Sequence, residues 1–222
     1  MPLVCLEQVS KVYRGSDGPV HALREVTLDV EGGEFVVVRG PSGSGKSTLL
    51  GIVGALGTPT AGKVRVAGED LVALSPAARA RFRARCVGFV FQMFHLFPYL
   101  TVLENVLAAA RPGEAQAARR RAGELLERCQ LAHRTRHRPG QLSAGECQRV
   151  AVVRAMINLP QLILADEPTG NLDPENAQAV LDLLFGFHRD WGGTVLLVTH
   201  QELAGNYAQR TISLREGRLV AP

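Results

Sequence analysis

GPSGSGKST, at residues 40–48, follows the apolar run EFVVV at 34–38 and leads into STLLGIVGAL at 47–56. The pattern G-x-x-x-x-G-K-[ST] runs from Gly40 to Ser47, and it is informative where a strand precedes it and a helix follows. The valine-rich run predicts a buried strand, and the residues after the loop have the apolar spacing of a helix. The stretch therefore predicts a phosphate-binding loop. A flexible linker is the alternative, which this context disfavours.

The residue types of the loop suit phosphate binding. Glycines lack a Cβ, so successive N–H groups can turn inward around a phosphate, with the positive end of the following helix dipole behind them. We expect Lys46 to reach the β and γ phosphates and the Ser47 hydroxyl to ligate Mg²⁺. The expected nucleotide-binding residues of the loop are Gly40, Pro41, Ser42, Gly43, Ser44, Gly45, Lys46, Ser47 and Thr48.

Charged side chains follow two further apolar runs. LILADE, at 162–167, ends with Asp166 and Glu167, and TVLLVTH, at 194–200, ends with His200. A carboxylate at the end of a buried strand is costly unless a cation or a bound water uses it. We expect Asp166 to hold a Mg²⁺ ion, Glu167 to act as general base on a water, and His200 to face the nucleotide. Polar strand ends without a catalytic role are the alternative.

Short valine- and leucine-rich runs alternate with helical patterns, which predicts an α/β fold with a mainly parallel sheet. The runs are residues 34–38, 87–91, 162–166 and 194–199, and the helical patterns are 47–56, 114–131, 146–157 and 175–190. Two half-exposed runs at 3–9 and 20–30 predict an antiparallel pair of strands at the edge of a sheet. The apolar spacing from Met93 to Arg138 is helical. We therefore expect one domain, 1–222, with a helical subdomain at 93–138 inserted into a nucleotide-binding core of 1–92 and 139–222.

The composition is that of a folded, soluble protein. Of 222 residues, 46% are hydrophobic and 21% are charged. No apolar stretch approaches the roughly 18 residues of a membrane helix, and the N-terminal sequence lacks the basic and apolar regions of a signal peptide. We therefore expect a cytoplasmic location. The four scattered cysteines contain no C-x-x-C pair and indicate neither a zinc site nor a disulfide framework.

Positive charge is concentrated in the middle of the chain. Residues 79–138 hold twelve arginines and four glutamates, an excess of eight, although the whole chain has a net charge of +4. Such a segment can face the phosphates of nucleic acid, an anionic membrane surface, or only solvent. The charge pattern alone leaves these three alternatives open.

LSAGE, at 142–146, distinguishes this chain from other phosphate-loop enzymes, and at this point the sequence resembles the ATP-binding cassette (ABC) family. The family's signature LSGGQ is matched except at its third and fifth positions. The resemblance covers essentially the whole chain. ADEPTGNLD (165–173) and HLFPYLTVLENV (95–106) are most similar to the branch that serves lipoprotein release, macrolide-type export and the related cell-division ATPase.

The resemblance implies a P-loop NTPase (RecA-like) core with an N-terminal antiparallel β subdomain and an inserted helical subdomain. It assigns nucleotide contacts to Tyr13 (adenine), to Ser143, Gly145 and Glu146 (signature) and to Asp173 (the end of the D-loop, 171–173). It assigns catalysis to Lys46, Gln92, Glu167 and His200. The Mg²⁺ ligands that it implies are Ser47, Gln92 and Asp166.

Two departures from the family signature have a physical meaning. Ala144 adds a methyl group where the family has glycine, which we expect to restrict φ and to crowd the approach to a nucleotide. Glu146 replaces a neutral glutamine by a carboxylate. Cys147 stands where arginine or glutamine is commoner in the branch. We therefore expect a working but slower site.

The resemblance implies a function that depends on partners. Two chains would close head to tail over two ATP molecules and couple hydrolysis to an integral membrane permease, with the cassette peripheral on the cytoplasmic face of the membrane. In the family the helical subdomain faces the membrane, which favours lipid and permease over nucleic acid for the arginine-rich segment. The alternative is a mechanotransmitter like the cell-division member. A soluble repair or translation cassette would carry a coiled-coil insertion or tandem cassettes, and this sequence shows neither. A nucleoside kinase is excluded because it does not use the LSAGE motif.

Overall fold

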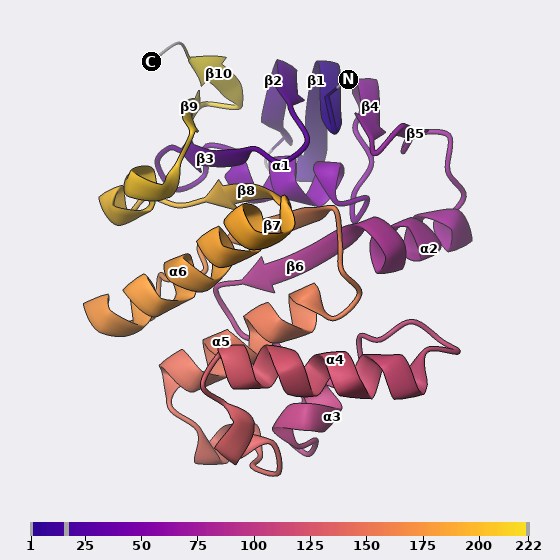
Figure 1. The fold of residues 1–222 in the computed structure, drawn as a ribbon. Coiled ribbons are helices and arrows are strands. Elements are labelled where there is room, and N and C mark those ends of the chain that lie inside the picture. Colours follow the sequence, from indigo (N-terminus) through magenta and orange to yellow (C-terminus); the bar gives the residue numbers. More distant parts are fainter. Residues whose placement is uncertain (1, 16–17, 221–222) are drawn as a thin grey trace.

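The computed structural model describes residues 2–15 and 18–220, which form two sheets with helices around them (Figure 1). The larger sheet has six strands in the order β10-β9-β3-β8-β7-β6. Neighbouring strands from β9 to β6 run parallel, and β10 pairs antiparallel with β9 at one edge. The strands are β3 (Phe35–Arg39), β6 (Val87–Phe91), β7 (Leu162–Asp166), β8 (Thr194–Val198), β9 (Arg210–Arg215) and β10 (Arg218–Val220).

The central strands of this sheet are buried on both faces. Phe35 and Val37 of β3 belong to one buried cluster, whereas Val36 and Val38 belong to a second cluster on the opposite face. This division follows from the two-residue period of a strand, and the residues of β7 and β8 divide in the same way. Burying each such side chain contributes roughly 1.5–3 kcal/mol. Burial on both faces explains why these strands are continuous apolar runs in the sequence.

Helices cover both faces of the larger sheet. The side chains of α1 share a cluster with the smaller sheet, so α1 lies between the two sheets, and α5 and α6 pack on the other face (Figure 1). The α-helices are α1 (Lys46–Val53), α2 (Pro76–Cys86), α3 (Val102–Leu107), α4 (Ala115–Arg128), α5 (Ala144–Met156) and α6 (Pro174–Trp191). Short 3-10 turns are η1 (Ala132–Arg134), η2 (Pro139–Gln141) and η3 (Glu202–Tyr207).

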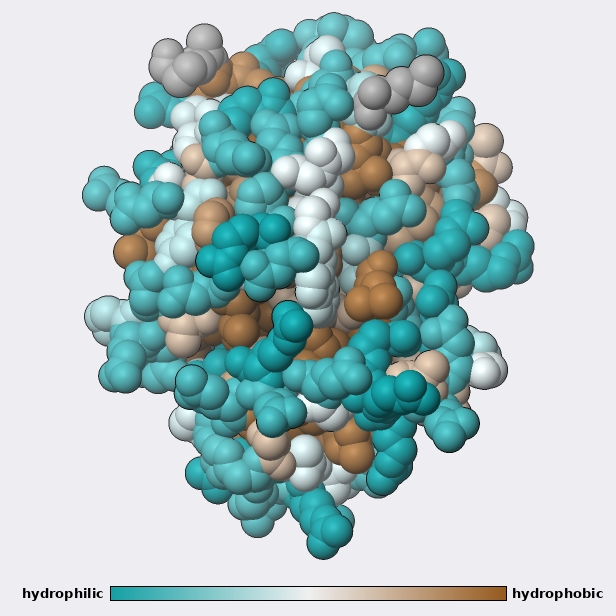
Figure 2. All heavy atoms as spheres, viewed as in Figure 1, coloured by the Kyte–Doolittle hydropathy of each residue, from teal (hydrophilic) through white to brown (hydrophobic). Residues whose placement is uncertain are grey.

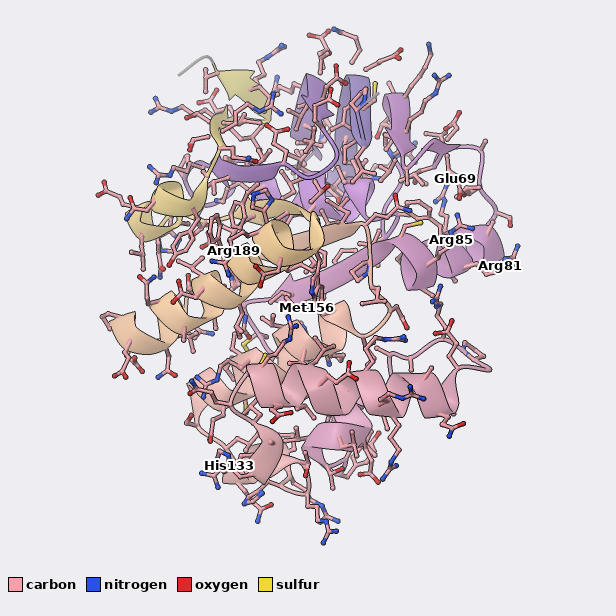
Figure 3. All side chains as sticks on the ribbon, viewed as in Figure 1. Glu69, Arg81, Arg85, His133, Met156 and Arg189 are labelled. Atoms are coloured by element: carbon pink, nitrogen blue, oxygen red, sulfur yellow. The ribbon has the colours of Figure 1, made fainter. Side chains whose placement is uncertain are left out.

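The smaller sheet is antiparallel and has four strands in the order β2-β1-β4-β5. Its strands are β1 (Val4–Gly15), β2 (Gly18–Val30), β4 (Ala61–Val66) and β5 (Glu69–Asp70). The predicted antiparallel pair is confirmed, but β1 is an interior strand because β4 pairs with its other side. Arg85 of α2 reaches Glu69 of β5 and ties this helix to the smaller sheet (Figure 3).

The segment between β6 and β7 contains helices and turns and no strand, as its apolar spacing predicts. Val106 of α3, Leu125 and Leu126 of α4 and Val153 of α5 share one buried cluster, so α3 and α4 pack on α5 below the larger sheet (Figure 1). Asn105 is completely buried, and its amide nitrogen donates to the carbonyls of Phe97, Leu100 and Thr101. The loop before α3 is therefore fixed from within.

The α/β class predicted from the sequence is confirmed, with parallel strands forming most of the larger sheet. Hydrophilic residues cover most of the face seen in Figure 2. Across residues 2–15 and 18–220, none of the helices combines the length and the apolar character needed to cross a bilayer.

Candidate functional site

Four adjacent parallel strands deliver the predicted catalytic residues to one edge of the sheet. The strands β3, β8, β7 and β6 are neighbours, so their carboxyl ends meet at the same edge. The phosphate loop follows β3, His200 follows β8, Glu167 follows β7 and Gln92 follows β6. Residues more than a hundred positions apart in the chain therefore become neighbours.

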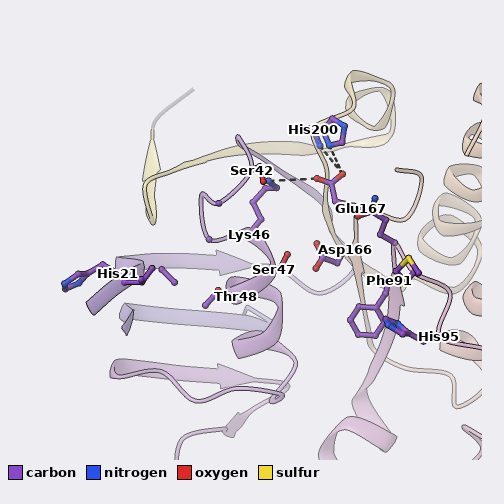
Figure 4. A pocket seen from close by; sticks show the side chains of 16 residues that line it. His21, Ser42, Lys46, Ser47, Thr48, Phe91, His95, Asp166, Glu167 and His200 are labelled. Carbon is purple, nitrogen blue, oxygen red and sulfur yellow. Dashed lines mark hydrogen bonds and ion pairs between the residues drawn. The ribbon is translucent and has the colours of Figure 1, made fainter. Parts of the chain in front are cut away.

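A cleft of about 890 Å³ lies at this edge (Figure 4). Its wall comes from four parts of the chain: residues 20–22 of β2, the phosphate loop with the start of α1, the segment 91–95, and the ends of β7 and β8. A cleft of this size with several convergent polar groups suits a small-molecule ligand. Its lining residues predicted from the sequence are Ser42, Gly43, Gly45, Lys46, Ser47, Thr48, Gln92, Asp166, Glu167 and His200.

The phosphate loop needs glycine at two of its positions for different reasons. Gly45 has a φ of 103°, in the left-handed region, and a Cβ there would lie 2.2 Å from the Ala22 carbonyl oxygen. A Cβ on Gly40 would lie 2.1 Å from the Leu214 carbonyl oxygen, so this glycine permits close packing of the loop on β9. The loop is therefore held closely between β2 and β9.

The remaining loop residues have distinct positions. Pro41 contributes its carbonyl to Lys46, and Ser42 and Thr48 line the cleft. Ser44 is only 3% exposed, and its hydroxyl has no hydrogen-bond partner within residues 2–15 and 18–220. A buried hydroxyl without a partner at this place is consistent with a loop that accommodates a polar ligand.

Lys46, Glu167 and His200 form a line of contacts along the cleft (Figure 4). The Lys46 Nζ donates to the carbonyls of Gly40 and Pro41, each at 2.9 Å, and lies 4.0 Å from Glu167 Oε1. The other carboxylate oxygen, Glu167 Oε2, lies 3.0 Å from His200 Nδ1. The carboxylate is therefore oriented between an ammonium group and an imidazole ring.

The backbone of Glu167 is also constrained. Its φ is 48°, in the left-handed region that non-glycine residues rarely adopt, at a cost of roughly 1–3 kcal/mol. The Glu167 N–H donates to the Val198 carbonyl at 2.9 Å, which fixes the turn after β7 against the end of β8. The surrounding structure holds Glu167 in a conformation that directs its side chain along the cleft.

Asp166, Ser47 and Gln92 supply oxygen atoms that fit a Mg²⁺ ion. Burial raises the pKa of the Asp166 carboxyl, and a hydrogen bond with the Ser47 side chain opposes that rise. The Gln92 amide nitrogen donates to Asn171 Oδ1 at 3.1 Å, which leaves its carbonyl oxygen available to the cleft. A carboxylate, a hydroxyl and an amide oxygen are hard donors of the kind that Mg²⁺ prefers.

Tyr13 lies beside the cleft and does not line it. It is 48% exposed, its ring lies under the Lys11 ammonium group, and its register partner Val20 lines the cleft. An exposed aromatic ring beside the phosphate loop is suited to stacking on a base. Its predicted role in adenine binding stays a prediction.

The signature residues do not line the cleft of their own chain. Ser143 is the N-cap of α5, where its hydroxyl accepts a hydrogen bond from the Glu146 N–H. Asp173 caps α6 in the same way by accepting from the Asn176 N–H, and this hydrogen bond lowers the pKa of the Asp173 carboxyl. These residues therefore lie outside the cleft of their own chain, and their contact with nucleotide stays a prediction.

The restriction of φ that Ala144 imposes has no cost in this structure. Ala144 is the first residue of α5, so its backbone is helical, and alanine adopts this conformation more readily than glycine. The residue is exposed. The predicted crowding of a nucleotide by its methyl group stays a prediction.

Several residues of the site lack a sequence signal. His21 and Ala22 of β2 and Phe91, Met93 and His95 line the cleft. The register of the β1–β2 pair brings 20–22 to the phosphate loop, and this register depends on bulges that no sequence pattern specifies. Asn176 also escaped detection, although its spacing of three from Asp173 is that of a helix N-cap and its partner.

Comparisons with known proteins agree with this geometry. The family described as "ABC transporter" matches residues 23–170. The lipoprotein-releasing system ATP-binding protein LolD of Geobacter metallireducens is 46% identical, and the alignment covers 96% of each chain. The macrolide export ATP-binding/permease protein MacB of Bradyrhizobium diazoefficiens is 45% identical over 99% of this chain, which corresponds to 34% of that relative's length.

A solved structure with the same fold is the ATP-binding cassette MJ0796, described as a dimer in a post-hydrolysis state bound to ADP and Pi. It has a TM-score of 0.89 and is 39% identical, covering 98% of this chain and 97% of its own. The cbiO1 protein of Clostridium perfringens, part of the transporter complex cbiONQ, has a TM-score of 0.87 and 26% identity.

Proposed function

Because this chain belongs to the ABC transporter family and is an ATPase of the LolD and MacB type, we propose that it is the cytoplasmic subunit that drives a membrane permease. Two copies close head to tail over two ATP molecules, and each site takes its phosphate loop from one copy and its signature from the other. The observation that carries the proposal is the division within one chain: the phosphate loop and catalytic strand ends line the cleft, whereas Ser143 and Gly145 do not.

ATP binding places the triphosphate in the phosphate loop. Backbone N–H groups of the loop and the N-terminus of α1 face the phosphates, and Lys46 leaves its carbonyl partners to contact them. Tyr13 stacks on the adenine. Ser47, Asp166 and Gln92 would hold a Mg²⁺ ion, which would supply charge neutralisation at the phosphates.

Hydrolysis uses the fixed carboxylate at the end of β7. Glu167 accepts a proton from a water molecule while the water oxygen attacks the γ-phosphorus, and the bond from that phosphorus to the ADP oxygen breaks. His200 holds the Glu167 carboxylate in place through the 3.0 Å contact (Figure 4). We also assign to its ring a contact with the γ-phosphate. The products are ADP and phosphate.

A groove beside the nucleotide cleft is suited to the permease. Its volume is about 320 Å³, and Phe91 lines both this groove and the nucleotide cleft. Arg83 and Arg154 line it together with apolar side chains. We assign the groove to a short amphipathic helix on the cytoplasmic side of the permease, with an acidic residue facing these arginines. The relative MacB is named as an ATP-binding/permease protein, which is consistent with such a partnership.

Exposed apolar residues extend this permease surface. Met93, Phe97 and Tyr99 are 65%, 45% and 66% exposed, and all three follow Gln92 in the chain. Large exposed apolar side chains that gather in one loop mark interaction surfaces. The peripheral attachment of the cassette to the cytoplasmic face of the membrane then depends chiefly on the permease. We do not expect nucleic acid to be a binding partner of this chain.

The transported substrate follows from the membrane subunits and not from this chain. The names of the relatives favour lipoprotein release or export. A mechanotransmission ATPase is the second candidate, in which the same ATP cycle changes the shape of a membrane partner that transports nothing. Purifying the membrane partner with this chain distinguishes the two candidates.

Glu167→Gln tests the catalytic assignment. We expect it to keep ATP binding and to slow hydrolysis by roughly 10²–10⁴-fold, the usual contribution of a general base. The ATP-bound dimer should accumulate and elute earlier in size-exclusion chromatography. Lys46→Ala is the matched control, because it should weaken the binding of a fluorescent ATP analogue itself. Turnover near that of the wild type in Glu167→Gln would rule out Glu167 as the general base.

A further inference from the structure

The signature helix and the D-loop are joined within one chain by Asn176, the third residue of α6. Its amide nitrogen donates to Asp173 Oδ2 at 2.7 Å, and its backbone N–H donates to Asp173 Oδ1 at 2.9 Å. Its side-chain oxygen, Oδ1, accepts a hydrogen bond from Arg149 Nη1 of α5 at 3.1 Å. One side chain therefore connects the end of the D-loop with the helix that follows Ser143.

The same side chain occupies the space next to Gly145. A Cβ placed on Gly145 would lie 1.9 Å from Asn176 Oδ1, 2.2 Å from its Cγ and 2.9 Å from its Cβ. Gly145 is buried, and its φ is not in the left-handed region, so its backbone conformation does not itself require glycine. Arg149 and Asp173 both form hydrogen bonds with the Asn176 side-chain amide. Rotating this side chain away from Gly145 would break these hydrogen bonds.

From these contacts we propose that Asn176 is a positioning residue that makes the signature motif and the D-loop of each chain one rigid unit. The inference rests on the proposed two-chain site, since both segments would face a nucleotide held by the partner copy. A shift of α5 is then transmitted to Asp173, and the partner copy meets both segments in a fixed relation. The Asn176 side chain of the same chain requires glycine at position 145, independently of any contact between Gly145 and a nucleotide.

A suppressor experiment tests the packing directly. Gly145→Ala should lower the thermal midpoint of unfolding by roughly 5 °C, as overpacking of a buried site does. Adding Asn176→Ala removes the two nearest atoms, so the double variant should be more stable than Gly145→Ala alone. The matched control is Gly145→Ala with Glu175→Ala, which changes an exposed neighbour on α6 and should restore nothing. Additive losses in the Asn176 double variant would overturn the proposal.

A second measurement tests the effect on function. Asn176→Ala with Gly145 intact should bind a fluorescent ATP analogue as tightly as wild type, because the phosphate loop is untouched. It should lower kcat and the ATP-driven dimerisation by about tenfold, since Ser143 and Asp173 no longer meet the partner as a unit. A merely structural role would lower the thermal midpoint without this split between binding and turnover, and unchanged kcat and dimerisation would therefore refute the positioning role.

The two proposals fail in distinguishable ways. The thermal midpoints are measured without nucleotide. The suppressor experiment therefore tests the packing of Asn176 against Gly145 whether or not the protein hydrolyses ATP. If wild type neither dimerises with ATP nor hydrolyses it, the proposed function is wrong. If wild type does both and Asn176→Ala does the same, only the inference about Asn176 is wrong.

Discussion

Glu146 stands where the family signature has glutamine, and its carboxylate has partners within its own chain. Glu146 Oε2 accepts from the Ser143 N–H at 2.8 Å, and Oε1 lies 3.0 Å from Arg134 Nε. The hydrogen bond from the Ser143 backbone, together with that from Arg134, lowers the pKa of the Glu146 carboxyl despite its partial burial. The carboxylate therefore stabilises the N-terminus of α5, and a contact with nucleotide stays a prediction.

Replacing this carboxylate gives a pH-dependent loss of stability. Glu146→Gln can still accept from Ser143 but lacks the charge that faces Arg134, so we expect it to be about 1 kcal/mol less stable at pH 7. Because the folded-state pKa lies below the ordinary 4.5, the charge stabilises the fold above about pH 4.5, and this contribution is lost as pH falls through the folded-state pKa. Urea midpoints of wild type and variant should differ at pH 7 and converge as pH falls through the folded-state pKa of Glu146.

The matched control for Glu146 is Glu7→Gln. Glu7 forms an exposed pair with Lys63 at 3.1 Å, so its loss should change stability by less than about 0.5 kcal/mol. A difference between wild type and Glu146→Gln that did not shrink at all as pH falls below 4.5 would contradict this interpretation, because protonation of Glu146 removes the charge.

Elements with a strong hydrophobic period were predictable, and elements with few buried residues were not. The four central strands and the helices α1, α4, α5 and α6 lie where the apolar spacing predicts them. Helix α2 buries only Phe82 and Cys86, which is too sparse a period to detect. β4 buries only two of its residues, Val64 and Val66, and therefore escaped detection as well.

The site was predictable to the extent that strand ends define it. Glycine spacing identified the phosphate loop, and acidic residues after an apolar run identified Asp166 and Glu167. The walls from β2 and from 91–95 were not predictable, because they depend on how the smaller sheet and the segment after β6 pack against the loop. The division of the chain into core and helical subdomain at 93 and 138 stays a prediction.

Half of the twelve arginines of residues 79–138 form hydrogen bonds or ion pairs within the chain. Six of them bond to carbonyls or carboxylates within residues 2–15 and 18–220: Arg79, Arg83, Arg85, Arg111, Arg121 and Arg134. Arg121, on α4, donates to the Ile157 carbonyl and to Glu114. Arg119 and Arg120 on the same helix are exposed and are the better candidates for contact with anionic lipid.

Helix α4 therefore offers a test of membrane contact. Arg119→Gln with Arg120→Gln should reduce sedimentation with vesicles that contain an anionic lipid, since each arginine near such a surface contributes about 1 kcal/mol. ATPase activity should not change, because neither residue approaches the cleft. Neutral vesicles are the lipid control, and Arg218→Gln on the other side of the molecule is the protein control. Equal binding of wild type and variant to anionic vesicles would show that both arginines face solvent and do not contact lipid.

At the scale of the whole molecule, the chain presents two half-sites. The sheet edge carries the phosphate loop, the proposed metal ligands and the proposed general base, and the N-termini of α5 and α6 carry the signature and the end of the D-loop. Because Ser143 and Gly145 do not line the cleft, we propose that a second chain completes each site. We therefore expect the ATPase activity to require two chains.

Mixing two inactive variants tests this claim most directly. Lys46→Ala disables the phosphate loop, and Ala144→Asp places a carboxylate at the exposed start of α5, where it suits the helix dipole but repels a γ-phosphate. In the mixed dimer, one site combines the intact loop of one chain with the intact signature of the other. If the two sites act independently, an equal mixture should recover roughly a quarter of wild-type ATPase activity, since half of the dimers are mixed and each has one intact site. A mixture no more active than either variant alone would contradict the two-chain site.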